Sequence, residues 1–588
     1  MSSEVRFILA IILMLGVLVG GNLLFPPEPP EDLQEPEIGE VVEDPPADPE
    51  PGPDSPPDDE PSGADEPTDP LIPEGLVEQP DPEETEPEPE ADPLPAVEEV
   101  AEAQVLVEGP LSRFTFSNVG ARVNSVELLG FESFTRPGPV QLVASEEAGF
   151  LGSRIVLEGD TLDLRDAPFE VSPEEGLRLE SGGDPQTLSF RYDHPTEPFY
   201  LQIRYTFLPD SYLVRVGGEV GGLGRGLLVS DLGEGLALNE VDEDQEQASM
   251  AYVVNHLQEG IRTTDLQSID GRVVDDGPFH WAAVKSRYFV VGVFPSMELG
   301  GAEYLGGVLA DVVGVEERRA SVAVAQSLSS TGSFAFDLFA GPQDYALLSE
   351  MGRDFQEVNP IGWGFIRPIL RPFVGIIMWV LVFFHETLDI GYGYVLILVG
   401  VLMRLLLFPL NHKAMRAQLR NMAVQPLLKD IQTKYKDQPE KMQKELMKLY
   451  KEHGFNPLAG CWPMLLPWPV LIALFFVFQN TIELRGVPFA WLPDLAAADP
   501  IYILPVLLGV SMFLLQWISL RTMEEVAPQM KMMMWVLPVV MVVIFANLPS
   551  GLNLYYLTAN VATLPQSWWI ARERQKVQAK GPPAPVEA

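Results

Sequence analysis

A length of 588 residues argues against a single small domain, and a formal net charge of −46 excludes a nucleic-acid-binding role for the acidic front half, because like charges repel phosphates. The lone cysteine, Cys461, excludes an intramolecular disulfide, and the six histidines have no metal-ligand spacing. His385 and Glu386 begin like a zinc-protease motif, but Asp389 stands where the second histidine is needed, so we expect no metal, cofactor or catalytic residue.

The chain begins with an apolar run. Phe7 to Phe25 is long enough to cross a hydrocarbon layer of about 30 Å as a helix. A cleaved signal peptide is the alternative, but Val19-Gly20-Gly21 fits a cleavage site poorly, so we favour a membrane anchor over residues 1–25. Arg6 before the run indicates a cytoplasmic N-terminus.

Residues 26–103 are rich in proline and acidic side chains, and no lysine or arginine occurs between Arg6 and Arg113. Such a segment buries too little apolar surface to offset its chain entropy, so it predicts a disordered linker extended by self-repulsion. A solvated tether is the simpler interpretation, and a specific interaction arm is the alternative.

Residues 104–345 have the pattern of β-strands. Leu201, Ile203, Tyr205 and Phe207 alternate with polar neighbours, and a similar alternation follows the turn at Pro209 and Asp210. Alternation interrupted by frequent turn residues is typical of a large antiparallel sandwich. No apolar run crosses this region, which predicts a soluble domain outside the membrane.

After residue 360 the composition becomes apolar. Residues 360–390 predict a helix that lies in the membrane interface or dips into it. Residues 391–575 then form a helical core with five expected membrane spans, at about 391–410, 460–480, 501–519, 532–548 and 552–570. A cytoplasmic tail follows at 576–588.

Residues 411–453 predict a cytoplasmic helical hairpin. Apolar residues recur at helical spacing, and a turn with a capping box is expected at 437–440. The segment has an excess of basic residues, which places it inside by the positive-inside rule. The basic side chains that would recruit partners are Lys413, Arg416, Arg420, Lys429, Lys434, Lys441 and Lys444.

Arg404 is the most informative residue, because it lies in an otherwise apolar span. A charge at the centre of a membrane helix costs roughly 2.5–3.5 kcal/mol on insertion scales. Snorkelling of the long side chain to the headgroups is one explanation. The other is that Arg404 faces a hydrated cavity within the bundle.

A second polar set supports the cavity. Asn553, Tyr556, Asn560 and Thr563 share one face of the last span, while Ser511 and Gln516 add polar atoms in 501–519. Each residue alone is equally explained by a hydrogen bond between helices. Together with Arg404 they predict a wet groove.

These residues resemble those of the YidC/Oxa/Alb family of membrane insertases, in the Gram-negative form with a large outer domain. The similarity covers most of 104–575 and is carried by short motifs: Phe116-Ser117-Asn118, Trp281-Ala282, Arg404-Leu-Leu-Leu-Phe-Pro-Leu410, Gln425-Pro426, Asn456-Pro457-Leu458-Ala459-Gly460-Cys461, Phe489-Ala490-Trp491, Pro549-Ser550-Gly551 and Tyr555-Tyr556.

The resemblance implies a multi-domain protein of the bacterial inner membrane, with an anchor helix, a periplasmic antiparallel β-supersandwich and a five-span insertase core. It implies a non-enzymatic groove open to cytoplasm and lipid, lined by Arg404 with Tyr555 and Tyr556 near the substrate. Gly400 departs from the family, whose members often have a hydroxyl there. The implied partners are nascent membrane proteins, the Sec translocon, the ribosome, the signal-recognition targeting factors and the bilayer.

Three other functions remain open. Arg404 is also compatible with a secondary transporter of an anionic solute, although the spans show no repeated halves. Large β-sandwiches often host sugar sites, but no catalytic carboxylate pair is evident. An intramembrane protease lacks a nucleophile with a base.

Overall fold

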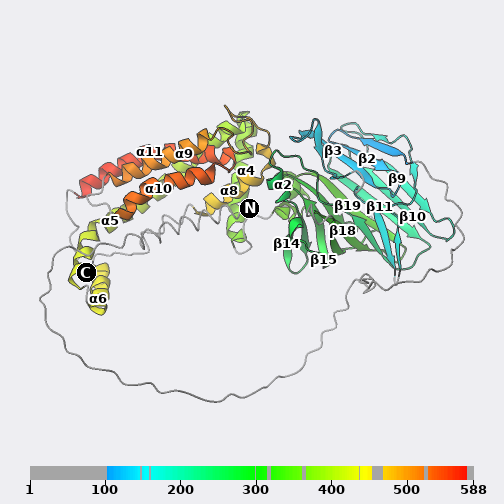
Figure 1. Cartoon of the computed structure of the whole chain (residues 1–588), viewed down its shortest axis with the longest axis horizontal. Coiled ribbons are helices and arrows are strands. Elements are labelled where there is room, and N and C mark those ends of the chain that lie inside the picture. Colours follow the sequence, from blue (N-terminus) through cyan, green and yellow to red (C-terminus); the bar gives the residue numbers. More distant parts are fainter. Residues whose placement is uncertain are drawn as a thin grey trace, which may run out of the picture.

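The computed structural model describes residues 102–145, 149–157, 160–297, 300–313, 319–359, 366–435, 438–452, 468–521 and 528–578. Figure 1 shows strands gathered at one end of the molecule, with helices extending from them toward the other end. The predicted anchor at 1–25, almost all of the linker and Cys461 lie outside the described residues.

The described residues of the β domain form two sheets. The five-stranded sheet has the order β4-β3-β2-β1-β8, and the larger sheet runs β6-β5-β12-β18-β17-β15-β16-β19-β11-β10-β9-β7, with β13 and β14 attached beside β15. The strands are β1 (Gln104–Glu108), β2 (Ser112–Ser117), β3 (Val123–Glu132), β4 (Pro139–Gln141), β5 (Ser153–Leu157), β6 (Asp160–Asp163), β7 (Glu170–Ser172), β8 (Leu177–Arg178), β9 (Gln186–Asp193), β10 (Tyr200–Phe207), β11 (Leu213–Gly221), β12 (Leu227–Asp231), β13 (Ala251–His256), β14 (Gly260–Asp265), β15 (Val273–Lys285), β16 (Phe289–Pro295), β17 (Leu305–Val313), β18 (Arg319–Ser327) and β19 (Ser333–Pro342).

The alternation read from the sequence explains the sandwich core. Leu201, Ile203, Tyr205 and Phe207 of β10 are all buried, and β10 pairs antiparallel with β11 across the predicted turn. Phe116 of the smaller sheet packs on Tyr205, with ring centroids 4.9 Å apart. The two sheets therefore share one apolar core, which follows from period-two burial on each strand.

The helices are α2 (Glu243–Gln247), α3 (Tyr345–Glu350), α4 (Arg367–Leu388), α5 (Tyr392–Lys434), α6 (Pro439–Glu452), α8 (Trp468–Asn480), α9 (Ile503–Leu520), α10 (Pro528–Phe545) and α11 (Ser550–Gln578), with single 3-10 turns η2 (Leu266–Ser268), η3 (Phe355–Val358) and η5 (Ile482–Leu484). In the core, α11 packs on both α5 and α9, α9 packs on α10, and α4 packs on α8. Figure 1 shows α9, α10 and α11 running alongside one another, away from the strands.

Among the described residues, three helical segments are long and apolar enough to cross a membrane: α4, residues Tyr392–Pro409 of α5, and α9. A shorter apolar stretch occupies Met534–Phe545 of α10. Apolar side chains also stay exposed along these helices, among them Val506 and Val510 of α9 and Val539 and Val543 of α10. Exposed apolar rows on neighbouring helices are expected where lipid is the solvent.

The helix boundaries differ in detail from the expected ones. The expected span at about 391–410 and the first part of the expected hairpin at 411–453 are one helix, because α5 continues without interruption through Pro409 to Lys434. The first arm of the hairpin is thus the same helix as the span. The second arm begins at Pro439, as the capping signal indicates, and α11 extends to Gln578, beyond the expected end at 570.

Candidate functional site

Arg404 lies on α5 and faces the first half of α11. Its side chain is half-buried, and it interacts electrostatically with the hydroxyl groups of Tyr555 and Tyr556. Within the part of the chain that the structure describes, Arg404 forms no ion pair. A guanidinium in an apolar span, with phenol oxygens beside it and no carboxylate, retains the capacity to bind an acidic group.

The two tyrosines are held by aromatic packing. Tyr555 is buried, with its ring centroid 6.0 Å from that of Phe478 on α8 and 5.6 Å from that of Tyr556. Tyr556 meets Phe545 of α10 edge to face at 5.3 Å. Each aromatic pair adds about 0.5–1.5 kcal/mol beyond area burial, so the rings beside Arg404 have fixed positions.

Ser511 and Asn560 form a polar link between α9 and α11. The Asn560 side-chain amide donates to Ser511 Oγ at 3.1 Å, and Ser511 Oγ donates to the carbonyl of Leu508 at 2.7 Å. Gln516 is half-buried further along α9. The structure thus brings Arg404 together with the tyrosines, and it pairs Ser511 with Asn560.

Asn553 and Gly400 have packing roles. Asn553 is fully buried, and its amide donates to the carbonyl of Phe545 at 3.0 Å, which ties α11 to the end of α10. Gly400 lies where α5 meets α11, and a Cβ there would approach Thr558 Cγ2 to 3.1 Å. The absence of a side chain at Gly400 therefore permits close contact between α5 and α11.

Only some of the basic side chains of the hairpin lie in the described part of the structure. Lys434 of α5 and Lys441 and Lys444 of α6 are exposed, and Lys434 Nζ lies 5.6 Å from the ring centroid of Tyr435. The remaining members of the basic set are on α5, but their side chains lie outside the described part: Lys413, Arg416, Arg420 and Lys429. A basic recruitment surface stays a prediction.

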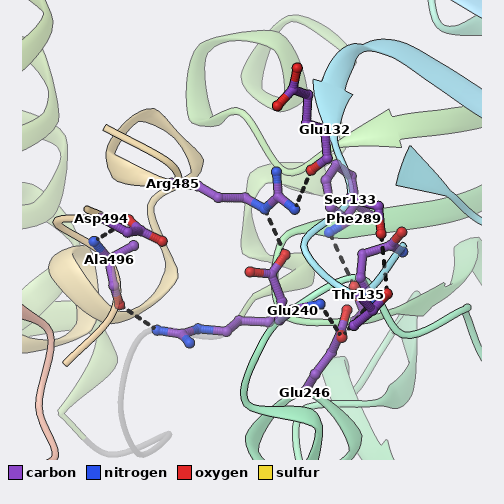
Figure 2. A network of polar contacts seen from close by, with 12 residues as sticks. Glu132, Ser133, Thr135, Glu240, Glu246, Phe289, Arg485, Asp494 and Ala496 are labelled. Atoms are coloured by element: carbon purple, nitrogen blue, oxygen red, sulfur yellow. Dashed lines mark hydrogen bonds and ion pairs between the residues drawn. The ribbon is translucent and has the colours of Figure 1, made fainter. Parts of the chain in front are cut away.

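Sequence reasoning missed two arginines where the β domain meets residues 481–499, which lie between α8 and α9. We call these residues the outer loop, after the side of the membrane on which we expect them. Arg485 of the loop reaches the β domain, where Nε lies 2.6 Å from Glu240 Oε1 and Nη2 donates to the Glu132 carbonyl at 2.9 Å (Figure 2). Arg287 of the β domain reaches the other way, to the carbonyls of Gln479 at 3.1 Å and Ala496 at 3.3 Å.

Both arginines are deeply buried. Arg485 has 3% of its side chain exposed and its partner Glu240 has 8%. The Arg485 guanidinium also lies 4.3 Å from the ring centroid of Phe134 and 5.3 Å from that of Phe289. The partners of Arg485 are more than two hundred positions away in the chain, so no local sequence pattern could have identified the pair.

Comparison with known proteins agrees with both parts of the molecule. The family model described as "YidC periplasmic domain" matches residues 104–376, and the one described as "60Kd inner membrane protein" matches residues 383–578. Two relatives named membrane protein insertase YidC come from Chlorobium limicola and Chlorobium phaeovibrioides. The first is 31% identical over 494 residues, covering 80% of this chain and 83% of the relative; the second is 32% identical over 495 residues, covering 79% and 83%.

A crystal structure of an active YidC insertase is similar at 19% identity, with 80% of this chain and 93% of that chain covered and a TM-score of 0.32. The matches to both domains confirm the predicted combination of an antiparallel β-sandwich with a helical membrane core. They also confirm the resemblance drawn from the short motifs. The chain therefore belongs to the YidC family of membrane protein insertases.

Proposed function

We propose that this chain inserts integral proteins into the inner membrane and helps them fold and assemble, alone or with the Sec translocon. The observation that carries the proposal is Arg404, a half-buried arginine in an apolar span that pairs with no acidic group among the described residues. Arg404, Tyr555 and Tyr556 form one wall of a hydrophilic groove open to the cytoplasm and to lipid.

The physical task is to lower the free-energy barrier to moving a polar tail of the substrate across the membrane. An unpaired polar group in hydrocarbon costs several kcal/mol, and a hydrated groove shortens the dry distance that the tail must cross. Arg404 attracts acidic groups of the tail during this passage. The apolar helix of the substrate then moves into lipid, driven by burial of about 25 cal/mol per Å² of apolar surface, so no nucleotide or catalytic residue is needed.

The surrounding elements fit the same task. Helix α4 buries Leu370 and Val374 against the core while Ile376 and Trp379 stay exposed, and in Figure 1 it crosses the direction of the long helices. This supports a position of α4 in the lipid–water interface on the outer face of the inner membrane. The N-terminus and the α5–α6 hairpin are then cytoplasmic, and the β domain is periplasmic.

The basic hairpin receives substrates from the ribosome and the signal-recognition targeting factors. Exposed lysines on α6, such as Lys441 and Lys444, suit ribosomal RNA or anionic lipid, because each neutralises a phosphate. The extension of α5 beyond Pro409 makes the hairpin a rigid continuation of the span that carries Arg404.

The test replaces Arg404 in cells depleted of their own insertase. We expect Arg404→Ala to reduce insertion of substrates with acidic tails by about tenfold, which corresponds to about 1.4 kcal/mol in the barrier, and Arg404→Lys to retain part of the activity. Protease protection of newly made substrate measures insertion.

The matched control is Arg521→Ala, which removes an exposed arginine that stacks on Trp517 at the end of α9. We expect this control to insert normally. Normal insertion of every acidic-tailed substrate by both Arg404 variants would overturn the role of the charge.

A further inference from the structure

The outer loop fastens the ends of several helices at once. The backbone amide of Ser550 donates to the Ala497 carbonyl at 2.7 Å, and Gly551 donates to the Leu495 carbonyl at 2.8 Å. At the other end of the loop, Asp499 accepts the amide of Leu504 at 2.7 Å in the first turn of α9. Because α11 begins at Ser550 and carries Tyr555 in its second turn, the position of the loop is transmitted to the site beside Arg404.

The β domain is attached to this loop by a buried cluster of charges. The cluster contains two cations, Arg287 and Arg485, and three carboxyl groups, Glu240, Glu246 and Asp494. The three carboxyl groups outnumber the two arginines, and burial raises the pKa of each carboxyl group. Burial disfavours the ionised form of a carboxyl group, so we expect one of the three to bind a proton more readily than it would in water.

Glu246 forms no ion pair within the described part of the chain, whereas its neighbour Glu240 pairs with Arg485. Its Oε2 accepts the backbone amides of Asn239 at 2.8 Å and Glu240 at 2.9 Å, and Figure 2 shows it beside Glu240. Its Oε1 is buried with no hydrogen-bond partner in the described structure. Glu246 therefore holds the backbone that presents Glu240 to Arg485, and a proton on Glu246 removes a buried negative charge beside Glu240.

We propose that the β domain is locked onto the outer loop through Arg485 and Arg287, and that protonation of Glu246 sets the strength of this lock. With Glu246 neutral, the four remaining charges balance and the junction is tight. When Glu246 ionises, its charge repels Glu240 and the junction loosens to let water reach the carboxylates.

The charges that face Glu246 fix the direction of the effect. The pKa of Glu246 is raised to about 7, chiefly by burial and also by the Glu240 carboxylate, while the backbone amides of Glu240 and Asn239 and the Arg485 guanidinium act to lower it. Arg136 reaches the side chain of Asn239, and Lys285 donates to the Ser249 carbonyl just beyond α2. The lock is therefore closed below neutral pH and opens as pH rises through neutrality.

The test measures the distance between the two parts in the full chain, reconstituted in lipid nanodiscs with Cys461→Ser. Spin labels replace Leu257 of the β domain and Trp491 of the outer loop, both exposed positions. Double electron–electron resonance spectroscopy then gives the distribution of distances between the two labels at about pH 6 and about pH 8.5, on either side of the titration of Glu246. We expect one narrow distance at the lower pH and a second, longer distance at the higher pH.

Glu246→Gln mimics the protonated carboxyl and should keep the single narrow distance at both pH values. Glu243→Gln, on an exposed position of the same helix α2, should behave like the unsubstituted chain. The unsubstituted chain alone also tests the lock, because its change should have a midpoint near pH 7. A narrow distribution at both pH values in that chain, or broadening of Glu246→Gln at the higher pH, would overturn the proposal.

Discussion

Arg485 is buried and Arg404 is half-buried, and their surroundings differ in kind. Arg485 is enclosed by the Glu240 carboxylate, the Glu132 carbonyl and aromatic rings, so it is ion-paired and hydrogen-bonded within the chain. Arg404 has the phenol oxygens of Tyr555 and Tyr556 nearby and no carboxylate among the described residues. We expect Arg485 to stabilise this interface and Arg404 to be available to an incoming chain.

The largest expected effect is a difference in the free energy of unfolding between variants of the two arginines. Arg485→Ala leaves Glu240 buried without its cation, which should lower the free energy of unfolding by about 3–5 kcal/mol. Arg404→Ala removes a charge that has no carboxylate partner, so unfolding should change by less than about 1 kcal/mol. Denaturant titration of the purified full chains in detergent, followed by tryptophan fluorescence, measures both.

Replacing both members of the pair checks the cause. Arg485→Met with Glu240→Gln removes the charges together and should recover much of the lost stability, because no buried charge is left unpaired. Equal losses for Arg485→Ala and Arg404→Ala would remove the distinction between the two sites.

The second effect is a change in stability with pH that arises from Glu246, where the β domain contacts the outer loop. Folding raises the pKa of Glu246 from 4.5 to about 7, so the folded chain binds this proton more tightly than the unfolded chain. The associated stability is complete below about pH 4.5 and is lost as pH rises through about 7, a change of roughly 3 kcal/mol. Thermal unfolding across this pH range should show the loss in the unsubstituted chain and not in Glu246→Gln.

The third effect concerns the contact that places Arg404 beside α11. Gly400→Ala should press on Thr558 and cost about 1–3 kcal/mol if the helices cannot separate. Gly391→Ala is the matched control, because a Cβ there meets no atom within 4 Å. Equal stability of the two variants in detergent unfolding would show that α5 and α11 are not closely packed at this depth.

The smallest effect tests the polar link between α9 and α11. Ser511→Ala and Asn560→Ala should show a coupling of about 0.6 kcal/mol in a double-mutant cycle, the average for hydrogen bonds between membrane helices. A coupling of zero would mean that water replaces the link, which would place Asn560 in the groove with Arg404.

The sequence was informative where physics acts locally. Alternation at Leu201, Ile203 and Tyr205 identified the sandwich, because burial on one face of a strand has a period of two residues. The apolar run around Arg404 identified a membrane helix and its one anomalous charge. Asn553 and Asn560 share a helix face, from which the sequence predicts a wet groove, and that groove stays a prediction; the hydrogen bonds that each residue makes depend on its neighbours.

The sequence did not predict the contacts between segments that are far apart in the chain. Nothing local distinguishes Arg485 from any loop arginine, since Glu132 and Glu240 lie hundreds of residues earlier. Nothing in the local sequence distinguishes Asp494 and Asp499 from other acidic residues, yet both accept backbone amides that shape the loop and the start of α9. Tertiary structure alone turns these common residues into a junction.

The most direct test of the role proposed for Arg404 is site-specific photocrosslinking to a stalled nascent membrane protein with an acidic tail. A crosslinker at Met403 or Thr558, next to Arg404 and Tyr555, should capture the tail, and neutralising the acidic residues of the tail should reduce capture by about tenfold. A crosslinker at Val539, an exposed apolar position of α10, serves as the control and should not respond to tail charge. Capture at 403 and 558 that is absent, or that is unchanged when the tail is neutral, would contradict a charge-guided passage beside Arg404.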